Sequence, residues 1–141
     1  MAEKALKISQ LQVKHFMITN PIYTTPEAKI SQTELLMLRK KIGGLPVIRD
    51  ATEKEVIGII TQRDIRLARF AMNLDTPNTR VSDLMTPDPI VVMKEDSLVK
   101  VLQLMHDNKI ERLPVVNERS ELIGLVIQYD ILTAIYSILK E

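Results

Sequence analysis

The stretch Gly58-Ile59-Ile60-Thr61-Gln62-Arg63-Asp64 decides the fold of this chain, because it recurs as Gly124-Leu125-Val126-Ile127-Gln128-Tyr129-Asp130. In both copies a short apolar run of the strand type leads into the start of a helical pattern. Outward from this stretch, the run from Val13 to Ala68 recurs from Val81 to Ala134. A duplicated unit that ends in an acidic residue indicates a paired receptor for a ligand, rather than one asymmetric catalytic pocket. The matched positions include Met17/Met85, Pro21/Pro89, Ile22/Ile90, Met37/Met105, Leu45-Pro46-Val47/Leu113-Pro114-Val115 and Asp64/Asp130.

Composition narrows the class of protein. The chain has 141 residues, of which 45% are apolar and 26% charged, as in a globular domain or in two small halves that share a core. A net charge of +1 and an aromatic content of 4% do not favour binding to nucleic acid. No apolar run approaches the ~20 residues that span a bilayer, and the first ten residues lack the pattern of a signal peptide. We therefore expect a cytoplasmic protein with no membrane partner.

Each copy predicts an extended segment, a helix, two strands and a closing helix. In the second copy Ser97 is a good N-cap, and apolar residues follow at helical spacing. In the first copy Thr33 and Glu34 interrupt the same stripe, which predicts a more exposed or partner-facing helix. The two stripes are Leu98, Val101, Leu102 and Met105, and Ile30, Thr33, Glu34 and Met37.

The remaining elements follow from apolar runs bounded by polar segments. Pro46 and Pro114 are predicted at strand starts, where a missing N–H is tolerated. The expected extended segments are 22–25 and 90–93, the strands 45–48, 56–61, 113–116 and 122–127, and the closing helices 62–74 and 128–139.

The repeat also sets the expected domain organisation: an N-terminal segment 1–12, repeat 1 at 13–74, a linker at 75–80 and repeat 2 at 81–141. A repeat of this size buries little apolar surface alone. We expect two β-α-β-β-α units in an α/β (α+β) fold, with small mixed sheets packed through a shared core. An approximate twofold axis would relate the units and create a cleft between them.

Several chemistries are unsupported. The chain has no cysteine, which excludes disulfides, thiolate metal sites and cysteine nucleophiles. It has no phosphate loop, dinucleotide-binding turn, nucleophile elbow or zinc-protease helix. His15 and His106 are far apart and lack spaced partners, so both are predicted as surface histidines rather than metal ligands. We expect no catalytic residue, metal or cofactor, and therefore no enzyme.

Thr61 and Asp64 suggest a nucleotide site. A hydroxyl and free backbone N–H groups at a strand-to-helix junction favour an anion. Asp64 lies one turn further along the same helix face, and its carboxylate can accept from both hydroxyls of a ribose. The alternative is that Thr61 only caps the helix and Asp64 is only a favourable acid in its first turn. The recurrence of aspartate at position 130 favours a functional role.

With these motifs in order, the chain resembles a tandem CBS-domain pair, also called a Bateman module. The resemblance covers nearly all of Val13 to Leu139. Its motifs are the opening Val81-Ser82-Asp83-Leu84-Met85-Thr86, the central Lys109-Ile110-Glu111-Arg112-Leu113-Pro114-Val115, and the closing Gly58-Ile59-Ile60-Thr61-x-x-Asp64. The resemblance implies a regulatory module that binds AMP, ADP, ATP or S-adenosylmethionine in the cleft between repeats.

The resemblance also implies site residues. In similar modules the aspartate holds the ribose, the hydroxyl residue touches phosphate, and adenine lies against the opening strand of the other repeat. Applied to this chain, one site contains Thr61, Asp64, Ile90, Val91 and Arg112, with Arg112 near phosphate. The second contains Asp130, Ile22 and Tyr23.

The second site is predicted to be weaker because Ile127 replaces the hydroxyl residue. Loss of one hydrogen bond to a charged group costs about 1.5–3 kcal/mol, or roughly ten- to a hundred-fold in affinity. Arg112 has an alternative role as a solvated partner of Glu111. Tyr23 either stacks on adenine or covers the sheet edge.

The expected function is a non-catalytic sensor of adenosine-containing ligands that signals to a separate protein. An apolar stripe along the C-terminal helix predicts a homodimer contact. The alternative is a ligand-free oligomerisation or interaction module in which the aspartates only cap helices. The stripe comprises Ile131, Leu132, Ile135, Tyr136, Ile138 and Leu139.

Overall fold

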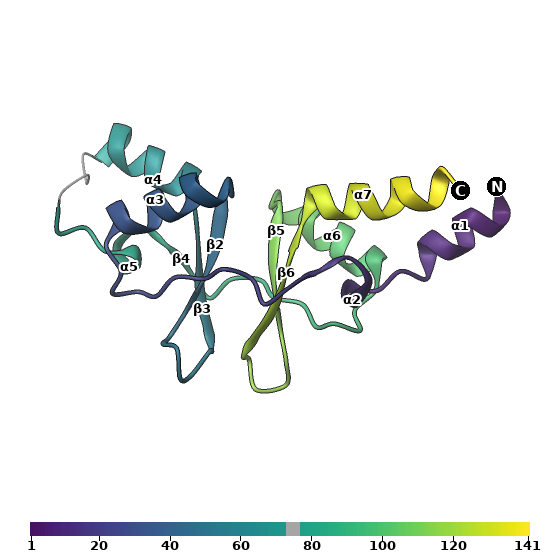
Figure 1. Ribbon diagram of the computed structural model, residues 1–141, viewed down its shortest axis with the longest axis horizontal. Coiled ribbons are helices and arrows are strands. Elements are labelled where there is room, and N and C mark those ends of the chain that lie inside the picture. The colour runs from purple at the N-terminus through teal and green to yellow at the C-terminus, as the bar shows by residue number, and fades with distance from the viewer. Residues whose placement is uncertain (73–76) are drawn as a thin grey trace. The chain divides into compact units, whose positions relative to one another are not determined.

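The computed structural model describes residues 1–72 and 77–141, which form two compact units (Figure 1). Unit 1 comprises Met1–Pro21 and Ile90–Glu141, and unit 2 comprises Ile22–Pro89. Each unit contains a three-stranded sheet and several helices, which confirms the predicted mixed class. Among the described residues, no helix is both long and apolar enough to span a membrane.

The sheets have matching topologies, and all their ladders are antiparallel. Unit 2 has the strand order β2-β3-β4 and unit 1 has β1-β6-β5. The predicted extended segments add only a single parallel bridge to each sheet, Thr24 to Val47 and Val92 to Val115. The strands are β1 (Ile18–Thr19), β2 (Gly44–Ile48), β3 (Val56–Thr61), β4 (Thr86–Pro87), β5 (Arg112–Val116) and β6 (Leu122–Ile127).

The opening segments of the two repeats are exchanged between the units. We call 13–19 and 81–87 the opening segments; they contain α2 (Val13–Phe16) with β1 and α5 (Val81–Leu84) with β4. β1 pairs with β6 of the second repeat, whereas β4 pairs with β3 of the first. Val13 and Phe16 lie in the core of unit 1, and Val81 lies in that of unit 2. Each core therefore combines residues of both repeats.

A methionine from each opening segment lies against a glycine of the central strand. A Cβ added at Gly124 would lie 2.8 Å from Sδ of Met17 and 3.0 Å from the carbonyl oxygen of Ile18. At Gly58 it would lie 2.6 Å from Sδ of Met85. All three distances are shorter than normal van der Waals contact. Glycine at these positions thus allows the opening segment to approach the sheet.

The first long helix of each repeat is α3 (Ile30–Lys40) in unit 2 and α6 (Leu98–Asn108) in unit 1. Ser97 caps α6 as predicted, since its hydroxyl accepts from the N–H of Lys100 at 3.1 Å. The prediction that α3 is more exposed is wrong, because its polar residues have partners inside unit 2. Thr33 is buried with its hydroxyl 3.1 Å from that of Thr24, and Glu34 accepts two hydrogen bonds from Arg69.

The predicted position of the strand prolines is also wrong. Pro46 and Pro114 are the third residues of β2 and β5, not the first. The carbonyl of Pro46 accepts from Thr24, and that of Pro114 accepts from Val92. In a strand the N–H and C=O of one residue point to the same side. The missing N–H therefore faces the outer edge of the sheet, where only a single bridge forms.

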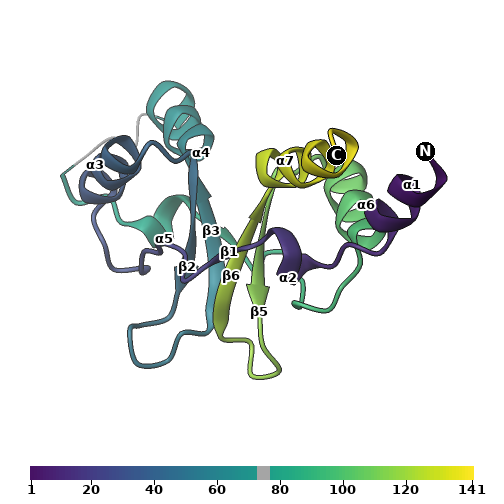
Figure 2. The same cartoon turned by 45° about the vertical axis from the view of Figure 1, so that its right-hand side comes forward.

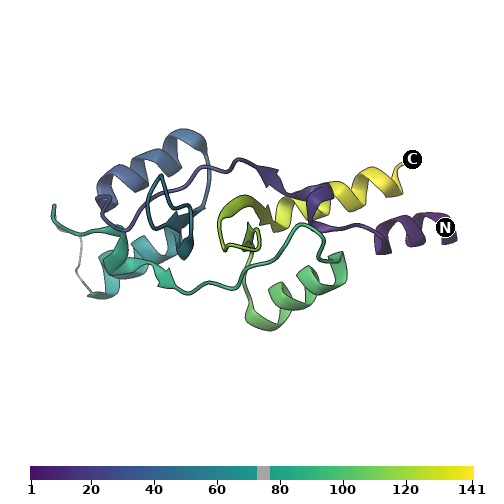
Figure 3. The same cartoon turned by 90° about the horizontal axis from the view of Figure 1, so that it is seen from below.

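The closing helices differ between the units. Helix α7 (Gln128–Leu139) has the predicted length, whereas α4 (Gln62–Leu67) continues into a π-helical turn, η1 (Ala68–Met72). The predicted end at Leu74 lies outside the described residues. Helix α1 (Ala2–Ser9) packs beside α7 (Figure 3), and Nζ of Lys4 donates to the carbonyl of Leu139 at 2.9 Å.

Candidate functional site

The corner between β3 and α4 contains a hydroxyl bonded to a carboxylate. β3 runs into α4 without a loop, and Thr61 is the N-cap with an extended backbone (φ −125°, ψ 162°). The Thr61 hydroxyl accepts from the N–H of Asp64 at 3.2 Å and donates to Oδ2 of Asp64 at 3.0 Å. The same Oδ2 accepts from the N–H of Thr61 at 2.9 Å. These bonds form a capping box that fixes the Asp64 carboxylate.

This geometry limits what Thr61 can offer a ligand. A threonine hydroxyl has one hydrogen to donate, and here it is directed at Asp64. A phosphate oxygen accepts hydrogen bonds, so contact with phosphate requires the Thr61 hydroxyl to turn away from Asp64. The other oxygen of Asp64, Oδ1, has no partner among the described residues.

At the corner between β6 and α7 (Figure 2), the strand also runs directly into the helix. The side-chain bonding differs from that at the β3–α4 corner. Ile127 is the N-cap (φ −119°, ψ 150°) and makes no side-chain cap bond. Oδ2 of Asp130 is buried and has no hydrogen-bond partner. Burial raises the pKa of the Asp130 carboxyl above its ordinary value, because the charged form loses hydration. Asp130 is therefore an acceptor whose bonding capacity is unused in the free protein.

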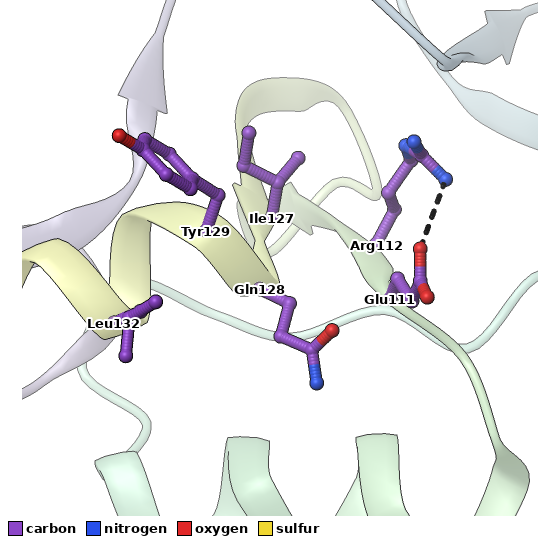
Figure 4. Close-up of a pocket in the computed structure, with 6 residues that line it drawn as sticks. All are labelled: Glu111, Arg112, Ile127, Gln128, Tyr129 and Leu132. Atoms are coloured by element: carbon purple, nitrogen blue, oxygen red, sulfur yellow. Dashed lines mark ion pairs between the residues drawn. The ribbon is translucent and has the colours of Figure 1, made fainter.

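Arg112 lies close to this second corner. It is the first residue of β5 and is paired with Ile127 across the ladder. Together with Gln128 and Tyr129 it lines a hollow of about 410 Å³ (Figure 4). Its nearest carboxylate, that of the exposed Glu111, is 4.0 Å away, and the Arg112 side chain is only 25% exposed. A half-buried guanidinium with one loose partner is suited to bind an anion.

The residues of each predicted site are divided between the two units. The structure places Thr61 and Asp64 in unit 2 with Ile22 and Tyr23, of which Ile22 is exposed and Tyr23 is half-buried. At the register of Arg112, unit 2 has Gly44 opposite Thr61 and thus no charge.

Unit 1 contains the remaining predicted residues. Ile90 and Val91 are exposed at 37% and 36%, and the buried Val92 next to them joins the sheet. Arg112 and Asp130 lie in the same unit.

Sequence reasoning did not identify Gln128 and Tyr129 as lining residues of the hollow. Both lie between Ile127 and Asp130 in the repeated stretch. Their position in the first turn of the predicted closing helix was the only sequence feature that placed them near Asp130.

Metal binding has no support from the described residues, which contain no group of three or more His, Asp and Glu that could hold an ion. Both histidines are exposed, as predicted. His15 has a local role, since its Nδ1 accepts from the N–H of Gln12 at 2.9 Å at the start of α2.

Comparisons with known proteins agree with this architecture. The CBS domain family matches the chain twice, at residues 13–70 and 81–137. CBSX2 from Arabidopsis thaliana, solved in complex with AMP, is 29% identical with a TM-score of 0.81, over 92% of this chain and 98% of that one. The CBS domain pair of protein MJ0100, solved with methylthioadenosine and S-adenosyl-L-methionine, is 25% identical with a TM-score of 0.78, over 88% and 98%.

The curated relatives are longer proteins. Inosine-5'-monophosphate dehydrogenase of Korarchaeum cryptofilum is 38% identical over 120 residues, which are 85% of this chain and 23% of that enzyme. The Streptococcus pyogenes serotype M3 enzyme is 32% identical over 131 residues, or 92% of this chain and 25% of the enzyme. The chain thus spans about a quarter of these relatives.

Two repeats, each with an antiparallel sheet and an aspartate at the strand-to-helix corner, define a tandem repeat architecture. The chain belongs to the CBS domain family and is a tandem CBS pair.

Proposed function

We propose that this protein is a non-catalytic regulatory module that binds adenosine-containing ligands and signals to a separate protein. AMP, ADP, ATP and S-adenosylmethionine are the candidate ligands. The observation that supports it most directly is the doubled corner, in which both repeats keep a carboxylate one turn into the closing helix. A relative with 29% identity was solved with AMP, which supports the same class of ligand.

The first proposed site uses Asp64 for the ribose and Arg112 for phosphate, with Ile90 and Val91 against adenine. Arg112 is a stronger phosphate contact than Thr61, because the Thr61 hydroxyl already donates to Asp64. The hollow beside Arg112, which is lined by residues of unit 1, leaves the guanidinium accessible to an anion. Thr61 contributes to this site mainly by fixing Asp64.

The second proposed site uses Asp130 for the ribose, with Ile22 and Tyr23 near the base. Unit 2 has the uncharged Gly44 at the register of Arg112, so this site depends less on phosphate and more on the sugar. We propose that it is the weaker site for a phosphorylated ligand.

Thermal unfolding with each of the four ligands tests the function. A ligand at a hundred times its Kd adds about 2.7 kcal/mol, which raises Tm by several degrees. Asp64→Ala is expected to remove most of this shift. Asp107→Ala is the matched control, because Asp107 is an exposed carboxylate whose side chain bonds only to His106. If no ligand shifts Tm and Asp64→Ala behaves like the control, the proposal is wrong.

A second candidate function is a ligand-free interaction module. The observation that favours it is the apolar face of α7, on which Leu132, Tyr136 and Leu139 are 62%, 61% and 45% exposed. Under this alternative, Asp64→Ala would lower stability slightly, and dimerisation would be the one measurable property. A saturable nucleotide titration that Asp64→Ala abolishes would eliminate it.

We also propose that the protein is cytoplasmic. We further propose that it forms a homodimer through the apolar face of α7. Sedimentation of the wild-type protein and of Leu132→Glu tests the dimer, since a charge on this face would oppose burial.

A further inference from the structure

The two closing helices have different side chains at three matched surface positions. These positions are spaced by three and four residues, so they lie on one face of a helix. All six side chains are exposed. The basic face of α4 and η1 comprises Arg63, Arg66 and Phe70, and the apolar face of α7 has Tyr129, Leu132 and Tyr136 at the same positions.

The arginines of the basic face have no partner within the part of the chain that the structure describes. Arg63 and Arg66 make no hydrogen bond or ion pair there, and Phe70 beside them is 83% exposed. Asp64 is the one carboxylate of α4, and its Oδ2 is bonded to Thr61. Two copies of this face would bring four arginines together without a free acid, and like charges across an interface oppose association. The basic face therefore requires a different surface as its partner.

The tyrosines on the apolar face of α7 are suited to accept a cation. Tyr129 is 71% exposed and Tyr136 is 61% exposed. Nζ of Lys140 lies 5.3 Å from the centre of the Tyr136 ring, so one ring of this face already has a cation beside it. An arginine guanidinium stacks on tyrosine rings more readily than lysine does. The exposed ring of Tyr129 is thus a contact point for an arginine.

A carboxylate lies beside the same face. Glu111 lines the same hollow as Tyr129 and Leu132 (Figure 4), and its side chain is 67% exposed. Its pairing with Arg112 is loose, at 4.0 Å, so the Glu111 carboxylate can accept a further guanidinium. The matching residue of the first repeat is Gly43. At this position, therefore, α7 has an acid beside it and α4 has none.

We propose that α7 of one copy of the chain packs against the basic face of α4 in a second copy. The arginines of the second copy stack on Tyr129 and pair with Glu111, and its Phe70 adds apolar contact. The inference rests on the proposed homodimer and names the surface that covers the apolar face of α7. A contact between two α7 helices would also bury apolar surface, but it would use neither the arginines nor Phe70.

Opposite charges at position 132 test this contact. Leu132→Lys places a cation against the arginines of the second copy, whereas Leu132→Glu places an anion there. Sedimentation equilibrium is expected to give a dimer dissociation constant roughly tenfold or more higher for Leu132→Lys than for Leu132→Glu. If α7 instead faces α7, each substituted residue meets its own copy, and the two variants weaken the dimer equally.

Exchange of charge identifies the opposing residue. Arg66→Glu should weaken the dimer by itself and should restore association when it is combined with Leu132→Lys. Arg119→Glu is the matched control, because Arg119 is an exposed arginine between β5 and β6 whose side chain has no partner among the described residues. Arg119→Glu should change neither the wild-type dimer nor the Leu132→Lys dimer.

The chain has no cysteine, so introduced thiols can be cross-linked without background. Arg66→Cys and Leu132→Cys proteins, mixed and treated with a short thiol-reactive cross-linker, should join to one another, and each alone should join poorly. Cross-linking of Leu132→Cys alone as efficiently as the mixture, or equal effects of Leu132→Lys and Leu132→Glu, overturns the inference while the homodimer stands. A wild-type protein that sediments as a monomer overturns both, and the proposed nucleotide sites stand in either case.

Discussion

Thr24 and Thr33 place two hydroxyl groups in the core of unit 2, where they lie 7% and 2% exposed. Their hydroxyl oxygens are 3.1 Å apart and share one hydrogen bond. The matching residues of the second repeat are Val92 and Val101, which are also buried. At these two matched positions the first repeat thus has a hydrogen-bonded polar pair, and the second has an apolar pair of the same shape.

This correspondence predicts strong coupling between the two threonines. Thr33→Val alone leaves the Thr24 hydroxyl buried without a partner and is expected to lower the free energy of unfolding by about 1–3 kcal/mol. Thr24→Val/Thr33→Val reproduces the pair of the second repeat and should recover most of this loss. Denaturant unfolding of the four proteins measures the coupling. Additive effects would show that the hydroxyl pair contributes nothing.

The raised pKa of Asp130 predicts how stability depends on pH. A carboxyl whose pKa is higher in the folded than in the unfolded state favours folding in acid, and this contribution is lost as pH rises through the folded pKa. At neutral pH the ionised Asp130 therefore opposes folding. Asp130→Asn should raise the Tm of the free protein at neutral pH, and the gain should shrink toward about pH 4. Asp107→Asn is the control, and a gain independent of pH would contradict this explanation.

At the scale of elements, the approach of each opening segment to its sheet depends on glycine. Gly124→Ala would place Cβ 3.0 Å from the backbone oxygen of Ile18 and 2.8 Å from Sδ of Met17. The sulfur can move but the backbone oxygen belongs to β1, so we expect a loss of about 1–3 kcal/mol. Hydrogen exchange should locate the effect in β1 and β6.

The double variant Gly124→Ala/Met17→Ala identifies which contact matters. If the methionine is the main obstacle, the double variant should be less destabilised than the sum of its single variants. If the carbonyl is the obstacle, the effects should add.

Elements set by local patterns were predictable from the sequence. The boundaries of β3, β6 and α7 match, and Ser97 caps α6, because alternation, helical spacing and capping act over a few neighbouring residues. The burial of α3 was not predictable, since Glu34 finds Arg69 and Thr33 finds Thr24 only after folding. The unpartnered oxygen of Asp130 likewise depends on three-dimensional burial and not on spacing.

At the scale of the whole molecule, the exchange of opening segments makes the repeats dependent on one another. The sequence shows where each repeat begins, but the pairing of β1 with β6 and of β4 with β3 joins residues far apart along the chain. Local patterns contain no signal for that choice of partner. The sequence repeat is therefore not the structural unit.

This dependence predicts the behaviour of fragments. Fragment 77–141 lacks Val13 and Phe16 of its core, and fragment 1–76 lacks Val81. Each is expected to be largely unfolded alone by circular dichroism, and an equimolar mixture should regain structure. A full chain cleaved after folding at a protease site inserted between residues 76 and 77 should stay folded. Cooperative unfolding of either fragment alone would contradict the prediction.

The exchanged opening segments also bear on how such a chain arose. In this chain the opening strand of each repeat pairs with the central strand of the other repeat. A protein with a single repeat would therefore have an unpaired edge on its central strand. Only the opening segment of a second molecule could pair with that edge. A one-repeat ancestor would thus have been a domain-swapped dimer that exchanged its opening segments. Gene duplication and fusion would then have turned an association that depends on concentration into one that does not.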